Sequence, residues 1–230
     1  MDTGFLNADE LKQIAVHPLA ELVPPSAHVS VRDAIQNPVL LLDDKLVDGR
    51  GRVREARRLG LPCPYVRIHA SYDDHPALVV ARAMTARVPK PETYERAVVC
   101  ARLVRAILLR PDWLDRYDLG MATRLKKRKN LDVILDACDV SLRSYDRAHM
   151  ILRDPMVEGA VLAGIVPLKT AERLVNVESK KLRHRLVQMP ADERLIALDR
   201  YFTRAGERHA DSQPALDGIE SVRRPRATGD

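Results

Sequence analysis

The segment from Leu46 to Gly60 constrains the fold more than any other part of the chain. Its sequence is LVDGRGRVREARRLG, in which two apolar residues are followed by an Asp-Gly pair and then by a ten-residue stretch that ends at a glycine. Asp-Gly is a frequent turn dipeptide, and a glycine directly after a helix is a common C-terminal signal. The segment therefore predicts a short strand, a tight turn and a helix over residues 50–59.

Three short apolar stretches around this segment predict the strands of a small sheet. Val39–Leu42 is a continuous apolar run, and Asp43-Asp44 separates it from a second run at 45–47. Two such runs joined by two turn residues predict a β-hairpin. Residues 65–69 alternate in polarity and predict a third strand. The order strand, strand, helix, strand favours a small α/β layer.

The rest of the chain is predicted to be helical, with apolar residues at helical spacing from Ala77 onward. Before the layer, prolines at positions 18, 24 and 25 predict an extended stretch over residues 6–23. The expected fold class is α+β, with an N-terminal segment at 1–15, an α/β domain at 16–88, a helical domain at 89–190, a C-terminal helix at 191–208 and a disordered tail at 209–230. Prolines at 89 and 91 interrupt this region before the helical spacing of Tyr94 to Leu108, and further helices are expected at about 114–125, 131–138, 142–153, 156–163, 168–176, 180–188 and 191–205.

Composition excludes several classes of protein. No apolar run approaches the roughly 18 residues that a membrane-spanning helix needs, and the N-terminus has no secretory pattern. The three cysteines lack metal-ligand spacing, which predicts reduced thiols, no metal site and a cytoplasmic location. A net charge of +6 is weak evidence for nucleic acid unless the basic residues are clustered.

Arginines are clustered at the predicted strand-to-helix turn. Gly49, Arg50, Gly51, Arg52 and Arg54 surround the expected first turn of the helix at 50–59. Free N–H groups at a helix N-terminus favour an anion, glycines allow close approach, and arginines add charged hydrogen bonds. These residues are candidates for phosphate binding. The alternative is a tight turn into a surface helix whose arginines are solvated.

This arginine segment resembles the glycine–arginine box of the ParB/sulfiredoxin-like domain. HPLAELVPP before it, the VLLL run and YVRIH after it stand in the order that this family uses, over residues 16 to 190. The resemblance implies the family's small α/β domain followed by a helical DNA-binding domain. Gly49, Arg52 and Arg54 match the box, whereas Arg50 stands where many partition proteins have Glu and sulfiredoxins have a reactive cysteine. Sulfinic-acid reduction is therefore not expected.

The resemblance also implies a nucleotide ligand, because partition proteins of this family bind CTP with Mg²⁺. The family's second nucleotide box corresponds to residues 82–87, where only Arg87 matches. Arg82 and Ala83 replace the Glu and Asn that assist with the metal and the triphosphate, and neither supplies the oxygen ligand that Mg²⁺ prefers. We therefore expect a degenerate pocket with Arg87 in it and no catalytic residues.

A second motif lies at residues 134–148, with the sequence ILDACDVSLRSYDRA. Small Ala137 and Ser141 as an N-cap are typical of a helix-turn-helix, whereas Asp139 occupies the turn position where glycine is commonest and weakens the match. Ser141, Arg143, Ser144 and Arg147 are then candidates for DNA binding at the exposed side of the second helix. A plain αα-hairpin is the alternative, since it shares most of these features. VSLRSYDRA resembles the recognition segment of ParB-like proteins.

A dense basic run precedes this motif and includes Lys126, Lys127, Arg128 and Lys129. A solvated charged face is the simple alternative. Because the run lies next to the predicted helix-turn-helix, we expect it to contact DNA phosphates.

The expected function is DNA binding in plasmid or chromosome partition, or in transcriptional regulation. Double-stranded DNA, a second copy of the chain, and a partner ATPase or the transcription machinery are the partners that the resemblance implies, with no membrane. Full partition proteins add a C-terminal dimerisation domain, whereas this chain offers only the segment at 191–205. A CTP-hydrolysing enzyme or a nuclease is the alternative, and an interaction module with a vestigial pocket is the third reading.

Overall fold

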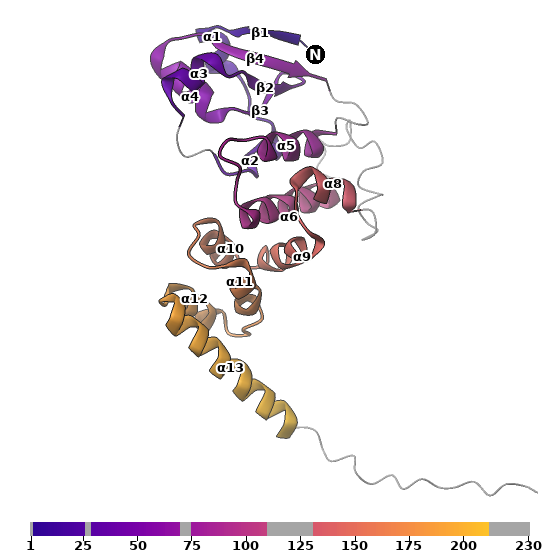
Figure 1. The fold of residues 1–230 in the computed structure, drawn as a ribbon, viewed down its shortest axis with the longest axis vertical. Coiled ribbons are helices and arrows are strands. Elements are labelled where there is room, and N and C mark those ends of the chain that lie inside the picture. The colour runs from indigo at the N-terminus through magenta and orange to yellow at the C-terminus, as the bar shows by residue number, and fades with distance from the viewer. Residues whose placement is uncertain (1, 26–28, 70–74, 110–130, 212–230) are drawn as a thin grey trace, which may run out of the picture.

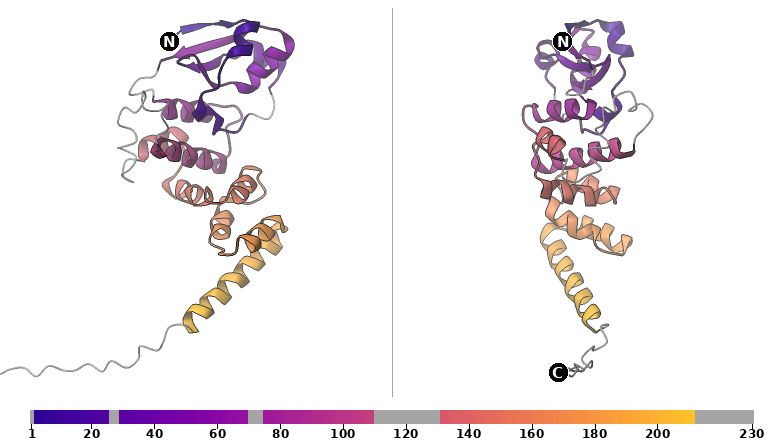
Figure 2. Two further views of the ribbon diagram at one scale, coloured as in Figure 1. Left: turned by 180° about the vertical axis from the view of Figure 1, so that it is seen from behind. Right: turned by 90° about the vertical axis from the view of Figure 1, so that its right-hand side faces the viewer.

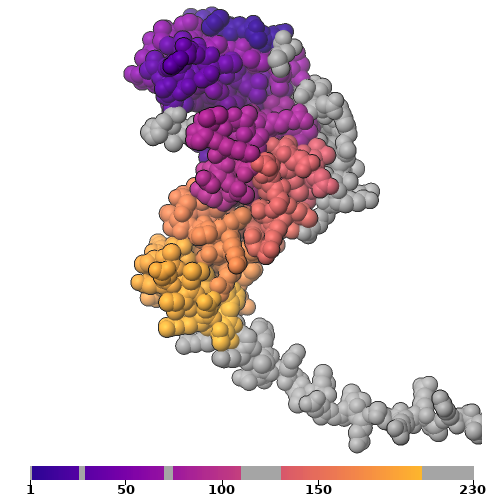
Figure 3. Space-filling model, viewed as in Figure 1, coloured from indigo at the N-terminus to yellow at the C-terminus, as the bar shows by residue number. Residues whose placement is uncertain are grey.

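The computed structural model describes residues 2–25, 29–69, 75–109 and 131–211. An α/β layer lies at one end of an elongated molecule, helices are stacked beneath it, and the last helix extends away at the other end (Figures 1 and 3). This arrangement is the α+β fold that the sequence predicts. The elements are β1 (Asp2–Leu6), α1 (Ala8–Gln13), α2 (Pro18–Glu21), α3 (Val31–Gln36), β2 (Val39–Leu42), β3 (Lys45–Asp48), α4 (Arg50–Leu59), β4 (Cys63–Ile68), α5 (Pro76–Thr85), α6 (Thr93–Leu109), α8 (Asp132–Cys138), α9 (Leu142–Ile151), α10 (Pro155–Leu162), α11 (Leu168–Val175), α12 (Lys180–Gln188) and α13 (Ala191–Asp211).

The sheet has four strands in the order β1-β4-β2-β3. The predicted hairpin of β2 and β3 is confirmed, and both of its turn residues, Asp43 and Asp44, have positive φ angles. Two left-handed residues match the twist of a two-residue hairpin, and aspartate tolerates that conformation better than most residues. β2 is parallel to β4, and β1 is antiparallel to β4.

Residues 2–23 contain more regular secondary structure than the sequence predicts. β1 forms an edge strand that the sequence analysis does not predict, and the expectation of an extended stretch over residues 6–23 is wrong. Asn7 caps α1 and forms a capping box with Glu10, while His17 caps α2 and is followed by proline at the first helical position. Such caps satisfy backbone N–H groups that have no partner within the helix, and proline fits the first position because it lacks an N–H.

Both faces of the central strands are buried, which explains the continuous apolar run of β2. Val39 and Leu41 belong to a core that includes Val53 and Ala56 of α4. Leu42, in contrast, belongs to a second core that continues through the helices as far as α13. Because successive side chains of a strand point to opposite faces, a strand buried on both sides has no polar alternation.

The helices predicted after residue 76 are confirmed wherever the structure describes them. The strand predicted at 65–69 begins two residues earlier, at Cys63, and the last helix continues to Asp211. The helix expected at 114–125 lies outside the described residues. α5 packs against α6 and α8 as well as against β3, so it joins the layer to the helices (Figure 2). Within the described ranges, no helix has the length and apolar character needed to cross a membrane.

Candidate functional sites

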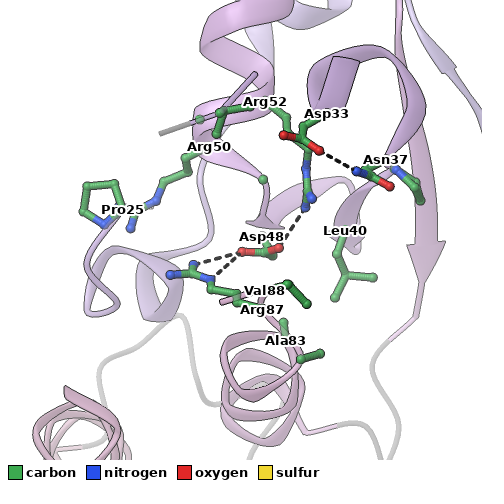
Figure 4. A pocket seen from close by; sticks show the side chains of 15 residues that line it. Pro25, Asp33, Asn37, Leu40, Asp48, Arg50, Arg52, Ala83, Arg87 and Val88 are labelled. Atoms are coloured by element: carbon green, nitrogen blue, oxygen red, sulfur yellow. Dashed lines mark hydrogen bonds and ion pairs between the residues drawn. The ribbon is translucent and has the colours of Figure 1, made fainter. Parts of the chain in front are cut away.

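A cavity of about 660 Å³ opens where the α/β layer meets the helices. The end of β3, the first turn of α4, α3 and the end of α5 form its walls (Figure 4). A volume of this size is within the usual range for small-molecule pockets. Its lining residues are Pro25, Val29, Asp33, Asn37, Pro38, Leu40, Asp48, Gly49, Arg50, Gly51, Arg52, Ala83, Ala86, Arg87 and Val88.

Two glycines shape the entry to α4 beside this cavity. Gly49 has a φ of 99°, and a Cβ atom there would lie 2.6 Å from Cγ1 of Val39. A Cβ atom on Gly51 would lie 2.5 Å from Cγ2 of Val29. Both separations are far below a van der Waals contact, so the chain needs glycine at both positions. The glycines therefore let the backbone at the start of α4 approach its neighbours and line the cavity.

Asp48 is the centre of an ion-pair network on the cavity wall. Its Oδ2 accepts a hydrogen bond from Nη2 of Arg52 at 2.8 Å, and its Oδ1 accepts from Nε and Nη2 of Arg87 at 3.2 and 2.9 Å (Figure 4). Arg87 also donates from Nη1 to the carbonyl of Pro24 at 2.9 Å. Arg52 and Arg87 come from sequence positions 35 apart, and one carboxylate holds both at the cavity.

The other two predicted phosphate-binding arginines differ in position. Arg50 lines the cavity, and its Nη2 donates to the carbonyl of Val23. Burial and the nearby charge of Arg87 lower the pKa of Arg50, which indicates a crowded, partly desolvated cation. Arg54 is exposed on α4 and is not among the residues that line the cavity. Arg50, Arg52 and Arg87 are thus brought together, and Arg54 is not.

Three polar residues of the cavity are not among the site residues that the sequence predicts: Asp48, and also Asp33 and Asn37, which α3 and its C-terminus supply. Asp33 accepts from the Ser30 hydroxyl at 2.6 Å and from Nδ2 of Asn37 at 3.0 Å. The hydrogen bonds from Ser30 are the main cause of the lowered pKa of Asp33. The spacing of Ser30 and Asp33 is a capping-box pattern and indicates the start of a helix. It carries no signal that this helix borders a cavity.

The second candidate site is the pair of helices α8 and α9, which are joined by Asp139, Val140 and Ser141. Asp139 has a left-handed conformation with a φ of 51°. Arg96 of α6 is buried, and it donates to the Asp139 carbonyl at 2.6 Å and also to the Asp139 carboxylate. Lys90 adds an ion pair to that carboxylate at 2.5 Å. These cations explain how an aspartate occupies a turn position where glycine is commonest.

The predicted DNA-binding residues of α9 are not equally available. Ser141 and Arg143 are exposed, whereas Ser144 and Arg147 are half-buried. Ser141 caps α9 by accepting from the backbone N–H of Ser144 at 3.2 Å. Nε of Arg147 donates to Oε2 of Glu172 on α11 at 2.8 Å, an ion pair that the sequence analysis does not predict. The basic run at 126–129 lies outside the described residues.

Comparison with known proteins shows the fold of the chain. No family model matches the sequence, and no curated protein matches it. Among the solved structures, one described as a Pnob8-like ParB-N domain is similar with a TM-score of 0.60 and 14% sequence identity, over 90% of this chain and 96% of that one. The chain therefore has a ParB-N-like fold, as the sequence resemblance implies.

Proposed function

We propose that this chain is a DNA-binding protein of the ParB-like type and that α8 and α9 are its helix-turn-helix. The observation that carries the proposal is the three-residue turn between the two helices, with a left-handed residue at its first position. Helix-turn-helix motifs join two helices by a turn of about three or four residues, and the second helix enters the major groove. The ParB-N-like fold supports the same assignment.

The side chains of α9 differ in exposure, and this difference supports separate roles for them: some anchor the helix on the core and others face the DNA. Tyr145, Ala148 and Ile151 are buried and fix the helix on the core. Arg143 is exposed near the N-terminus of α9, and we find no hydrogen bond or ion pair for it within the described part of the chain. An arginine so placed is suited to reach a guanine edge, for which two parallel hydrogen bonds are available.

Arg147 has a different proposed role, because Glu172 already holds it. An ion pair between two half-buried side chains fixes α9 against α11, which packs on it. We propose that Arg147 sets the angle of α9 and that Arg143 reads the bases. Lys126, Lys127, Arg128 and Lys129 would supply phosphate contacts beside it.

The proposed biological setting is plasmid or chromosome partition, or transcriptional regulation. We propose a homodimer, since two-fold symmetric proteins match palindromic sites. Along α13, Leu198 is buried in the chain's own core, whereas Leu195 and Ile196 are 42% and 53% exposed. These two residues are the candidates for contact with a second copy. A partner ATPase or the transcription machinery would complete the assembly.

The cavity beside α4 is the proposed nucleotide site. Its arginines and the uncapped first turn of α4 supply positive charge and donors for phosphate, and its volume suffices for a nucleotide. The alternative of a CTP-hydrolysing enzyme or a nuclease has no specific support, since the described residues contain no cluster of three or more potential acidic, histidine or cysteine metal ligands.

A genomic selection tests the proposed DNA-binding function. The purified protein is incubated with sheared genomic fragments, bound DNA is recovered and sequenced, and an Arg143→Ala variant is treated in parallel. We expect a small set of enriched sites for the natural protein and loss of that enrichment for the variant. Recovery of fragments in proportion to their abundance by both proteins would contradict the proposal.

A further inference from the structure

The acidic side chains of the cavity beside α4 are already hydrogen-bonded to neighbouring groups. Both carboxylate oxygens of Asp48 accept hydrogen bonds from arginines. Both oxygens of Asp33 also accept hydrogen bonds, one from Ser30 and the other from Asn37. Mg²⁺ binds carboxylate oxygens directly at short distance and demands near-octahedral geometry. Asp48 keeps one lone pair beyond these bonds, but a metal bound there would lie beside two guanidinium cations, whose charge opposes Mg²⁺ binding.

The two positions that correspond to the family's metal-assisting Glu and Asn also lack a ligand for Mg²⁺. Arg82 is exposed at the surface of α5, and Ala83 lines the cavity with a methyl group. Neither supplies an oxygen ligand. Among the lining residues, only the amide oxygen of Asn37 remains as an uncharged side-chain ligand, and this single group beside three arginines is a poor fit for a magnesium-bound triphosphate.

The cavity does fit a smaller anion. Three arginines and two aspartates line it, which leaves one positive charge in excess. No side chain caps the N-terminus of α4, so the positive end of the helix adds to the attraction for a phosphate. A single phosphate group carries a charge of about −1.5 to −2 at neutral pH, whereas a triphosphate without its metal carries about twice that or more.

One side of the cavity is apolar and suits the uncharged part of a ligand. Leu40 of β2, Ala83 of α5 and Val88 lie together there, beside Arg87 and away from Arg50 (Figure 4). Val88 is 97% exposed, which is unusual for an apolar side chain that borders a cavity. Contact with an apolar or aromatic body would remove this surface from water.

We infer that the cavity binds a metabolite with one phosphate group, of the nucleoside monophosphate class, and that it does so without a divalent cation. This inference rests on the proposed nucleotide site and departs from the magnesium-bound CTP that the sequence resemblance implies. Arg50, Arg52 and Arg87 hold the phosphate with the first turn of α4. Asp48 orients two of these arginines and limits the negative charge that the cavity accepts.

Calorimetry on the full chain tests the inference with cytidine monophosphate and cytidine triphosphate, each with EDTA and with excess Mg²⁺. The adenosine pair repeats the series, because the lining residues do not identify a base. We expect the monophosphate to bind equally well with EDTA and with Mg²⁺ and more tightly than the metal-free triphosphate. Binding only of the magnesium triphosphate would overturn the inference but leave the nucleotide site intact. No binding of any of the four nucleotides would overturn both.

Three variants test which side chains hold the phosphate. Asp48→Asn removes one negative charge but keeps the shape and a hydrogen-bond acceptor, so monophosphate binding should strengthen by roughly threefold to tenfold. If Asp48 were a metal ligand, the same change would instead weaken binding in the presence of Mg²⁺. Arg50→Ala should weaken binding by about tenfold to a hundredfold, and the matched control Arg54→Ala on the same helix should bind as the natural protein does. Circular dichroism verifies that each variant is folded.

Discussion

Arg87 lies just beyond the C-terminus of α5, and its Nη2 is 2.9 Å from Oδ1 of Asp48 at the end of β3. Both side chains are 17% exposed. The pair therefore connects the α/β layer to the segment that leads into the helices, in surroundings that screen charge less than bulk water does.

Replacement of Arg87 by alanine removes this connection and leaves part of the Asp48 carboxylate without a partner. We expect the free energy of unfolding to fall by about 1.5–3 kcal/mol, the range for hydrogen bonds to charged groups. Urea denaturation followed by circular dichroism measures the change. The control is Lys12→Ala, which breaks a fully solvated pair with Asp9 and should cost less than about 0.5 kcal/mol. Equal effects of the two changes would show that the pair at Asp48 is not structural.

Two glycines that differ in surroundings provide a test of the entry to α4. Gly49→Ala places a Cβ atom against Val39 and keeps a left-handed backbone, so we expect it to destabilise the chain by about 1–3 kcal/mol. Gly159 lies within α10, and a Cβ atom there would meet no atom within 4 Å. Gly159→Ala should therefore stabilise by about 0.5–1 kcal/mol through helix propensity. Thermal unfolding of both variants would reveal opposite shifts in Tm, and shifts of the same sign would refute this account of Gly49.

The turn between α8 and α9 should respond to acid. The hydrogen bond from Lys90, followed by that from Arg96, lowers the pKa of Asp139 below its ordinary value of 3.8. A carboxylate whose pKa is lower in the folded chain stabilises it above the unfolded-state pKa and loses that contribution as the pH falls through the folded-state value. Asn tolerates the left-handed conformation of this position and carries no charge.

We therefore expect Asp139→Asn to unfold at a lower temperature than the natural protein near about pH 6, and the two proteins to converge as the pH falls below the lowered pKa of Asp139. Differential scanning calorimetry at a series of pH values measures the difference. A gap in Tm that stays constant across that range would mean that the charge on Asp139 does not stabilise the turn.

The basic run outside the described residues is expected to contact phosphates and not bases. A double variant, Lys126→Ala with Lys127→Ala, should weaken binding to all duplexes alike and reduce the slope of log K against log salt by about 0.9 for each lost contact. The control is Lys12→Ala with Arg58→Ala, which removes the same charge from exposed positions of the α/β layer. An unchanged slope for the Lys126 and Lys127 variant would assign this run to a solvated face.

The sequence predicts the elements that local signals define, and it misses those that depend on distant partners. The hairpin at Asp43 and Asp44 and the helix that ends at Gly60 follow from turn and capping chemistry within a few residues. β1 does not, because of its five residues only Leu6 is buried and its pairing depends on β4, about sixty residues away. Asn7 and Glu10, in contrast, form a readable capping box that predicts α1 when it is looked for.

In the candidate sites, too, the sequence predicts local features but not contacts between distant residues. The arginines at 50 and 52 can be chosen from the sequence because they surround a glycine turn, but their engagement with Asp48 and Val23 depends on tertiary packing. Arg147 is placed correctly on α9 by helical spacing. Its ion pair with Glu172 is not predictable from the sequence, since the two residues lie on separate helices 25 positions apart.

The most direct test of the proposed function is the affinity of α9 variants for DNA, measured by fluorescence anisotropy on a selected site and on a random duplex. Arg143→Ala is compared with Arg200→Ala, which removes an exposed arginine from α13. We predict that Arg143→Ala costs about 1–3 kcal/mol on the selected site and much less on the random duplex, because a base contact carries specificity. Arg200→Ala should bind both as the natural protein does. If Arg143→Ala, still folded by circular dichroism, binds the selected site as tightly as the natural protein, the assignment of α8 and α9 as a DNA-reading helix-turn-helix is wrong.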